Sequence, residues 1–194
     1  MRKGANLISV GKRAGRPSAK QDHVNKLLTD YAMTGARVIR LKSGDAGIFG
    51  RLEEELDALR AAGIAYEIVP GVSSACAAAA AAGVPLTRRH TARRVQFVAG
   101  AAVTGGLPQD LNWNALADPR ATTAVFMGKR TFPELARKLV RHGLPPDTPS
   151  ILAESVGRSS QRIIRTSLAG LAEELAKDTV QATAIIIYGP LAGS

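Results

Sequence analysis

The sequence predicts an α/β protein with a largely parallel sheet. Short apolar runs alternate, in the first half of the chain, with segments whose apolar side chains recur at helical spacing. Strands that alternate with helices are typical of parallel sheets, because each helix carries the chain back to the edge where the next strand begins. Glycine and proline residues separate the two kinds of segment, as expected for turns.

Strands and helices alternate regularly as far as the strand at 95–100. The earlier strands are expected at 6–10, 37–41 and 66–70, and the helices at 19–35, 53–63 and 73–83. Gly35 and Gly63 are the expected stops of the first two helices. The third, "SSACAAAAAAG", combines serine caps with strong helix formers, so it can pack closely against a sheet or a ligand.

The amino-acid composition of the sequence changes after residue 100. Residues 101–121 are rich in Gly, Pro and Asn and are expected to connect two domains, at 1–100 and 101–194. The second domain is expected to contain strands at 122–127, 150–154, 161–166 and 183–188, and helices near 132–142 and 168–177.

Composition restricts the class of protein. A formal net charge of +10 favours anionic partners. The basic residues are spread along the chain and aromatic residues are few, so nucleic acid is an unlikely partner and a small polyanion in a cleft fits as well. The single cysteine, Cys76, excludes an internal disulfide and is expected to be buried. No metal site, no membrane span and no secretory signal are expected, and the cytoplasm is the default location.

Three segments have the character of loops that follow strands: "KSGDAGIFG", "VPGVSSA" and "FMGKR". Ligands of open α/β sheets bind beyond the carboxyl ends of the strands. Asp45 can accept hydrogen bonds from hydroxyl groups, and Ser73 and Ser74 near a helix N-terminus suit a carboxylate. Met127 offers an apolar surface. Together they suit a small amphipathic cofactor.

Each of these features also has a purely structural interpretation. A Gly-Asp pair after a strand is often only a turn, and a methionine at a strand end usually packs in the core. Arg51 and Glu54, three residues apart, would form an ordinary ion pair on a helix. Taken singly, none of these residues decides the function.

The order of the motifs is more specific than any one of them. "SVGKRAG", "VIRLKSGDAGIFGR", "EIVPGVSSA", "AGVPLTRR", "VFMG" and "QRII" follow one another along essentially the whole chain. In this order the chain resembles the uroporphyrinogen-III C-methyltransferases of the tetrapyrrole methyltransferase family. The resemblance implies two α/β domains, with a mostly parallel N-terminal sheet, a mixed C-terminal sheet, and S-adenosyl-L-methionine (SAM) in the cleft between them. It also implies a homodimer that transfers two methyl groups to uroporphyrinogen III, giving precorrin-2 for siroheme, cobalamin or heme d1.

The resemblance also implies roles for individual residues. The cofactor-binding positions are Ser43, Gly44, Asp45, Ile48, Ser73, Ser74, Met127 and Val156. The catalytic positions are Arg51, Glu54 and Lys12, and the substrate-binding positions are Arg89 and Met127. Arginines suit a substrate that carries carboxylates, but an arginine is too basic to remove a proton. Glu54 or a carboxylate of the substrate is therefore the expected base.

The chain departs from the family pattern at its start. Family members carry a further strand, a glycine-rich SAM loop and an aspartate ahead of "VGKRAG", so we expect a chain that lacks one wall of the SAM site, through a misassigned or truncated start or as a natural fragment. Ser43 in place of a glycine, and His90 and Ala101 in place of a common Asp and His, are smaller departures.

Three alternatives to a uroporphyrinogen methyltransferase stay open on the sequence. One is another methyltransferase of the same fold, acting on a later corrin intermediate, a modified histidine or a ribose of ribosomal RNA. The second is a truncated paralogue without catalytic activity. The third, a basic nucleic-acid-binding module, has no recognisable motif in its favour.

Overall fold

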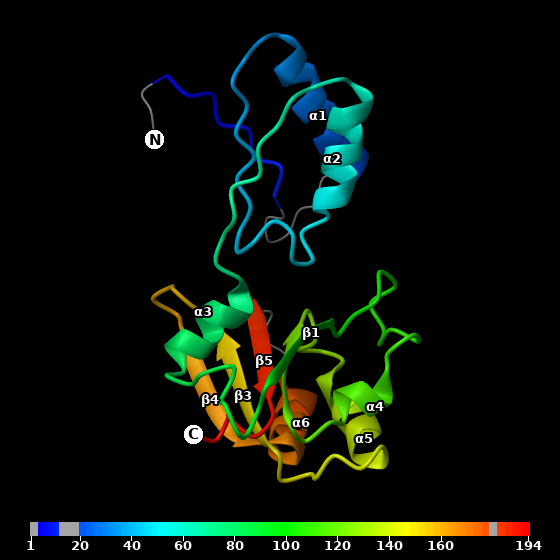
Figure 1. Cartoon of the computed structure of the whole chain (residues 1–194), viewed down its shortest axis with the longest axis vertical. Coiled ribbons are helices and arrows are strands. Elements are labelled where there is room, and N and C mark those ends of the chain that lie inside the picture. Colours follow the sequence, from blue (N-terminus) through cyan, green and yellow to red (C-terminus); the bar gives the residue numbers. More distant parts are fainter. Residues whose placement is uncertain (1–3, 12–19, 179–181) are drawn as a thin grey trace. The chain divides into compact units, whose positions relative to one another are not determined.

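The chain forms two compact units, Met1–Gly71 and Val72–Ser194, in a computed structural model that describes residues 4–11, 20–178 and 182–194 (Figure 1). The two units are regions within which residues contact one another, and their boundary need not be a domain boundary. The domains expected at 1–100 and 101–194 therefore stay a prediction.

The first unit is organised around two helices, α1 (Gln21–Met33) and α2 (Leu52–Ala61), which pack against each other. Side-chain hydrogen bonds join the helices at their first turns. The Asn25 amide donates to the Glu54 carbonyl at 3.1 Å, and the Gln21 amide donates to the Glu55 carboxylate at 3.3 Å. Both helices lie where the apolar spacing predicts them.

The prediction of strands in the first unit is wrong for the described residues. Segments 6–10, 37–41 and 66–70 form no strand there. Their apolar side chains are largely exposed, with Leu41 and Val69 each 75% accessible. Strand formation requires a hydrogen-bonded neighbour and a face that is covered, and apolar alternation alone supplies neither. The parallel N-terminal sheet is thus absent from the described part of this unit.

The second unit contains a five-stranded mixed sheet with the order β1-β2-β5-β3-β4. Its strands are β1 (Arg94–Ala99), β2 (Ala121–Phe126), β3 (Pro149–Glu154), β4 (Arg162–Ser167) and β5 (Ala184–Tyr188). β1 and β2 are parallel, whereas β5 is antiparallel to both β2 and β3. Consequently β1, β2 and β3 run in one direction and end at the same edge of the sheet.

Helices cover the two faces of this sheet unequally (Figure 1). The helices of this unit are α3 (Ser74–Ala81), α4 (Trp113–Leu116), α5 (Phe132–Arg141) and α6 (Leu168–Lys177). α5 and α6 bury leucines against one face, where Val125, Leu152 and Ile186 belong to the same core cluster. On the other face α3 packs against β5 through small side chains, including Ala75 and Ala78, which are fully buried.

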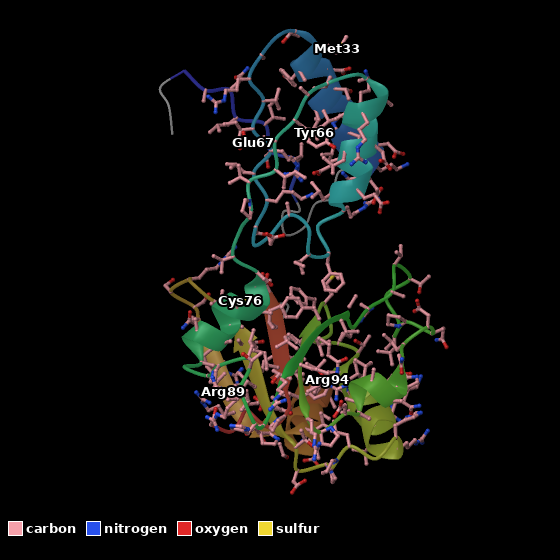
Figure 2. The ribbon with its side chains drawn as sticks, in the orientation of Figure 1. Met33, Tyr66, Glu67, Cys76, Arg89 and Arg94 are labelled. Carbon is pink, nitrogen blue, oxygen red and sulfur yellow. The ribbon has the colours of Figure 1, made fainter. Side chains whose placement is uncertain are left out.

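The elements of the second unit match the sequence prediction to within a few residues. Cys76 is an exception, because it was expected to be buried and is exposed on α3 (Figure 2). An alanine-rich helix has little contrast between its faces, so the spacing of its residues does not show which side meets the sheet.

Candidate functional site

The loop between residues 42 and 51 is folded around the carboxylate of Asp45. One carboxylate oxygen accepts the Gly47 N–H at 2.8 Å, and the other accepts the Gly71 N–H at 2.9 Å. These two bonds, that from Gly71 first, hold the pKa of Asp45 below its ordinary value, because they favour the charged form. Asp45 therefore joins two loops of the first unit, in addition to any contact with a ligand.

The same two loops approach each other closely through bare backbone. A Cβ atom at Gly71 would lie 2.2 Å from the Gly44 carbonyl oxygen, so a larger residue could not occupy this position without a shift of the backbone. Ser43 and Gly44 are exposed and Ile48 is half-buried. The predicted cofactor residues of the first unit thus lie together on one loop, which the hydrogen bonds of Asp45 hold in place.

A buried carboxylate anchors the start of this loop. Glu55 is only 3% exposed, and its oxygens are paired with Arg40 at 3.1 Å and Lys42 at 2.8 Å. An ionised group at this depth needs such partners, because burial removes the water that would otherwise stabilise its charge. Glu55 could not be identified as a site residue from the sequence, since a glutamate on a helix is usually exposed.

Arg51 and Glu54 form an ion pair at the end of the loop. The guanidinium binds both carboxylate oxygens, at 2.5 and 2.6 Å. This pairing raises the pKa of Arg51 and lowers that of Glu54. Both side chains are exposed and line a shallow pocket of about 470 Å³ together with Phe49, Gly50 and Arg60. The pair can therefore meet a ligand from solution.

In the second unit, the turns that follow β2 and β3 lie at the same edge of the sheet. Met127 and Ser155 directly follow these strands, and both have left-handed backbone angles, with φ of 55° and 49°. Residues other than glycine adopt this conformation only when their surroundings enforce it. Met127 is 56% exposed and thus available to a ligand, and Val156 beside Ser155 is half-buried.

A close backbone contact supports the turn at Met127. A Cβ atom at Gly100 would lie 2.6 Å from the Gly128 Cα, so the chain after β1 and the chain after β2 touch directly. The Thr131 hydroxyl, which is buried, donates to the carbonyl oxygens of Gly100 at 2.5 Å and Gly128 at 3.1 Å. This threonine could not be identified from the sequence, because its partner Gly100 lies 31 residues away along the chain.

The N-terminus of α3 carries the two predicted serines. The Ser73 hydroxyl is buried and caps the helix by accepting the Ala75 N–H at 3.3 Å, whereas Ser74 is exposed. Ser74 therefore has the hydroxyl available to a ligand, and the amides of the first turn add a local positive potential. At the other end of α3, Arg165 donates to the Ala82 carbonyl oxygen.

The structure does not bring Arg89 to the edge where Met127 lies. Arg88 and Ala92 pair in a tight turn before β1 begins, so Arg89 lies near the start of β1, whereas Met127 lies at the edge where β1 and β2 end. A six-residue strand, about 20 Å long, separates these two edges. Its role in substrate binding stays a prediction. Lys12 lies outside the described residues.

Comparisons with known proteins show the family to which the chain belongs. A model of the family "Tetrapyrrole (Corrin/Porphyrin) Methylases" matches residues 4–172. The chain belongs to the tetrapyrrole methylase family. Siroheme synthases of Methylococcus capsulatus and Gluconacetobacter diazotrophicus are 41% and 42% identical to it, over 99% and 97% of the chain. The chain spans about 40% of the length of these curated relatives.

Solved structures of tetrapyrrole methylases share the fold. Uroporphyrin-III C-methyltransferase from Thermus thermophilus, in complex with S-adenosylhomocysteine, is 34% identical with a TM-score of 0.73. The match covers 87% of this chain and 73% of the Thermus chain. A cobalt-precorrin-4 methyltransferase is 26% identical with a TM-score of 0.78, over 91% of this chain and 72% of its own.

Among the described residues, no group of His, Cys, Asp and Glu side chains has the arrangement of a metal site. The described helices include none that is both long and apolar enough to cross a membrane.

Proposed function

We propose that this chain is a SAM-dependent methyltransferase that converts uroporphyrinogen III to precorrin-2, within siroheme synthesis. The observation that carries the proposal is the 34% identity to the Thermus uroporphyrin-III C-methyltransferase over 87% of this chain. The two relatives that are siroheme synthases support a place in siroheme synthesis. We also propose that the chain forms a homodimer and acts in the cytoplasm, and the family resemblance alone supports these two points.

The described residues suit SAM as the methyl donor. The exposed Ser74 at a helix N-terminus suits the carboxylate of an amino acid, and the exposed Met127 suits an apolar group. The loop around Asp45 offers backbone amides and carbonyls, and each Asp45 oxygen has a second lone pair beyond its bond to an amide. SAM supplies an electrophilic methyl group, and the chain has to hold the acceptor carbon in line with it.

Arg51 and Glu54 are proposed to act as a unit on the substrate. The raised pKa of Arg51 keeps its guanidinium charged, so it can bind a substrate carboxylate but cannot remove a proton. The lowered pKa of Glu54 makes its carboxylate a weak base as long as the pair is intact. We therefore assign Glu54 to orienting Arg51, and proton removal to a carboxylate of the substrate.

The proposal is tested by binding and turnover. SAM and S-adenosylhomocysteine are titrated into the chain by calorimetry, and the chain is then incubated with SAM and uroporphyrinogen III. Mass spectrometry is expected to show a tetrapyrrole that has gained methyl groups. A folded chain that binds neither nucleoside refutes the proposal, and binding without turnover favours the non-catalytic paralogue.

A later corrin intermediate is the second candidate substrate. It is favoured by the TM-score of 0.78 with the cobalt-precorrin-4 methyltransferase, which exceeds the 0.73 of the Thermus enzyme. Its sequence identity is lower, 26% against 34%, and side chains rather than backbone determine which substrate is recognised. A parallel assay with cobalt-precorrin-4 decides between the two substrates.

A further inference from the structure

Lys129, Glu154 and Asp178 form a buried ionic cluster next to the turns that carry Met127 and Val156. Lys129, two residues after Met127, lies with its Nζ atom 2.6 Å from Glu154 Oε1 and 2.8 Å from Asp178 Oδ2. Glu154 is the last residue of β3, and Asp178 follows α6. The Lys129 side chain thus connects the end of β2, the end of β3 and the end of α6.

The cluster is shielded from water. The side chains of Lys129, Glu154 and Asp178 are 16%, 6% and 13% exposed. Burial is the largest single influence and lowers the pKa of Lys129, but the hydrogen bonds to Asp178 and Glu154 and the negative charges of these two carboxylates together outweigh it, so the pKa is raised and Lys129 stays charged. A charge pair at this depth holds its geometry more strictly than an exposed pair, because no water competes for either group.

The topology makes this contact a direct link between two turns that the backbone does not join. β5 lies between β2 and β3, so these two strands share no backbone hydrogen bonds. Their ends are two strand spacings apart, about 10 Å. Lys129 crosses this interval to Glu154. The residues that follow β2 and β3 are Met127 and Ser155, whose left-handed backbone requires support from their surroundings.

A second cation extends the cluster away from the turns. Arg162, at the start of β4, lies 3.7 Å from the other Glu154 oxygen and 2.8 Å from Glu174 on α6. Arg162 is 55% exposed, so its pairs are weaker than those of Lys129. Lys129 is therefore the cation that sets the position of Glu154.

We propose that Lys129 is a positioning residue. Through its ion pairs with Glu154 and Asp178 it fixes the positions of the turns of Met127 and Val156 relative to each other. The inference rests on the proposed function only in naming SAM as the ligand of that edge. It assigns Lys129 no contact with the ligand and no part in proton transfer.

The main test uses Lys129→Gln, which removes the charge and keeps a polar side chain. The sequence has three methionines, so methyl-labelled methionine gives Met127 a resolvable NMR signal, and Met33 on α1 is an internal reference. We expect the Met127 methyl and Val156 amide signals to shift or broaden, and Met33 to stay unchanged. Calorimetry is expected to show a dissociation constant for SAM raised by about tenfold, the scale at which losing supporting contacts weakens a site.

Matched variants separate positioning from general loss of stability. Lys129→Arg keeps the charge and is expected to restore the signals of the wild type. Lys26→Gln removes a lysine that is 72% exposed in its pair with Asp30 and is expected to change nothing. If Lys129→Gln does not fold, Asp178→Asn removes one of the two anchors and is expected to shift the same signals in the same direction.

The outcomes distinguish this inference from the proposed function. A folded Lys129→Gln whose Met127 and Val156 signals coincide with those of the wild type overturns the positioning role. Wild-type protein that binds no SAM, together with shifted signals in the variant, overturns the proposed function and leaves Lys129 as the support of the two turns.

Discussion

At the scale of single residues, the carboxylate of Asp45 has one role that the sequence predicts and a second role that only the structure shows. Its place after the apolar run 37–41 predicts a ligand-binding residue, and the structure adds that its oxygens join the loop to Gly71. That second role depends on a residue far along the chain, which local sequence patterns cannot reveal.

Asp45→Asn is predicted to change the acid stability of the loop. The pKa of Asp45 is depressed in the folded chain, so its stabilising contribution is complete above the pKa of the unfolded chain, about 3.9, and is lost as pH falls through the folded value. Hydrogen exchange of the Gly47 and Gly71 amides, followed by NMR, is expected to accelerate in the wild type below pH about 4. In Asp45→Asn these amides are expected to exchange faster at neutral pH and to show no acid transition. An acid transition that persists in the variant would assign it to another carboxylate.

Glu54→Gln tests whether the ion pair orients the substrate or removes a proton. If Glu54 orients Arg51, the amide still accepts hydrogen bonds but holds the guanidinium less firmly, so KM for uroporphyrinogen III is expected to rise several-fold while kcat changes little. If Glu54 is the base, kcat should fall by about 100-fold or more and KM should change little. Steady-state kinetics separates these cases, and Glu67→Gln, an exposed glutamate of the same unit that does not line the pocket, is the matched control.

At the scale of elements, the sequence predicts the second unit far better than the first. Its strands are short runs of β-branched residues, as in "ATTAVF", and every residue of β2 is buried. Its helices have distinct apolar faces or strong helix formers, so pattern and packing agree. In the first unit, "VIRL" has the same apolar character, yet it pairs with no neighbour among the described residues. Whether an apolar run becomes a strand is decided by its partners, which local pattern does not specify.

Because the chain segments that follow β1 and β2 touch at Gly100 and Gly128, a larger side chain at Gly100 is predicted to lower the stability of the second unit. Gly100→Ala places a methyl group within 2.6 Å of the Gly128 Cα and 2.7 Å of Val125 Cγ1, so the backbone has to move. Overpacking of this kind is expected to destabilise the second unit by about 1–3 kcal/mol, measured by urea denaturation. Gly106→Ala adds the same methyl group where nothing lies within 4 Å, and is expected to unfold like the wild type. Equal midpoints for the two variants would show that the strand ends can separate without cost.

At the scale of the whole molecule, burial is distributed very unevenly. Among the described residues of the first unit, Val24 and Glu55 alone are buried, whereas the second unit contains a continuous core of large side chains around Leu135, Leu152 and Ile186. The apolar area removed from water is the main source of stability, so the two units cannot contribute equally. Residues predicted to bind the cofactor occur in both units, on the Asp45 loop of the first unit and on the turns of Met127 and Val156 in the second.

This distribution predicts two classes of hydrogen exchange. Amides of β2, β3 and β5 are expected to exchange only when the second unit unfolds, since these strands are the buried centre of the sheet. Amides of α1 and α2 are expected to exchange through a separate opening of lower free energy, because few apolar contacts resist it. NMR or mass spectrometry over a series of urea concentrations measures both free energies. SAM is expected to slow exchange around Asp45 and Met127, because a ligand of the native state stabilises the residues that bind it. One shared free energy for all of these amides, with or without SAM, would show that the chain unfolds as a single cooperative body.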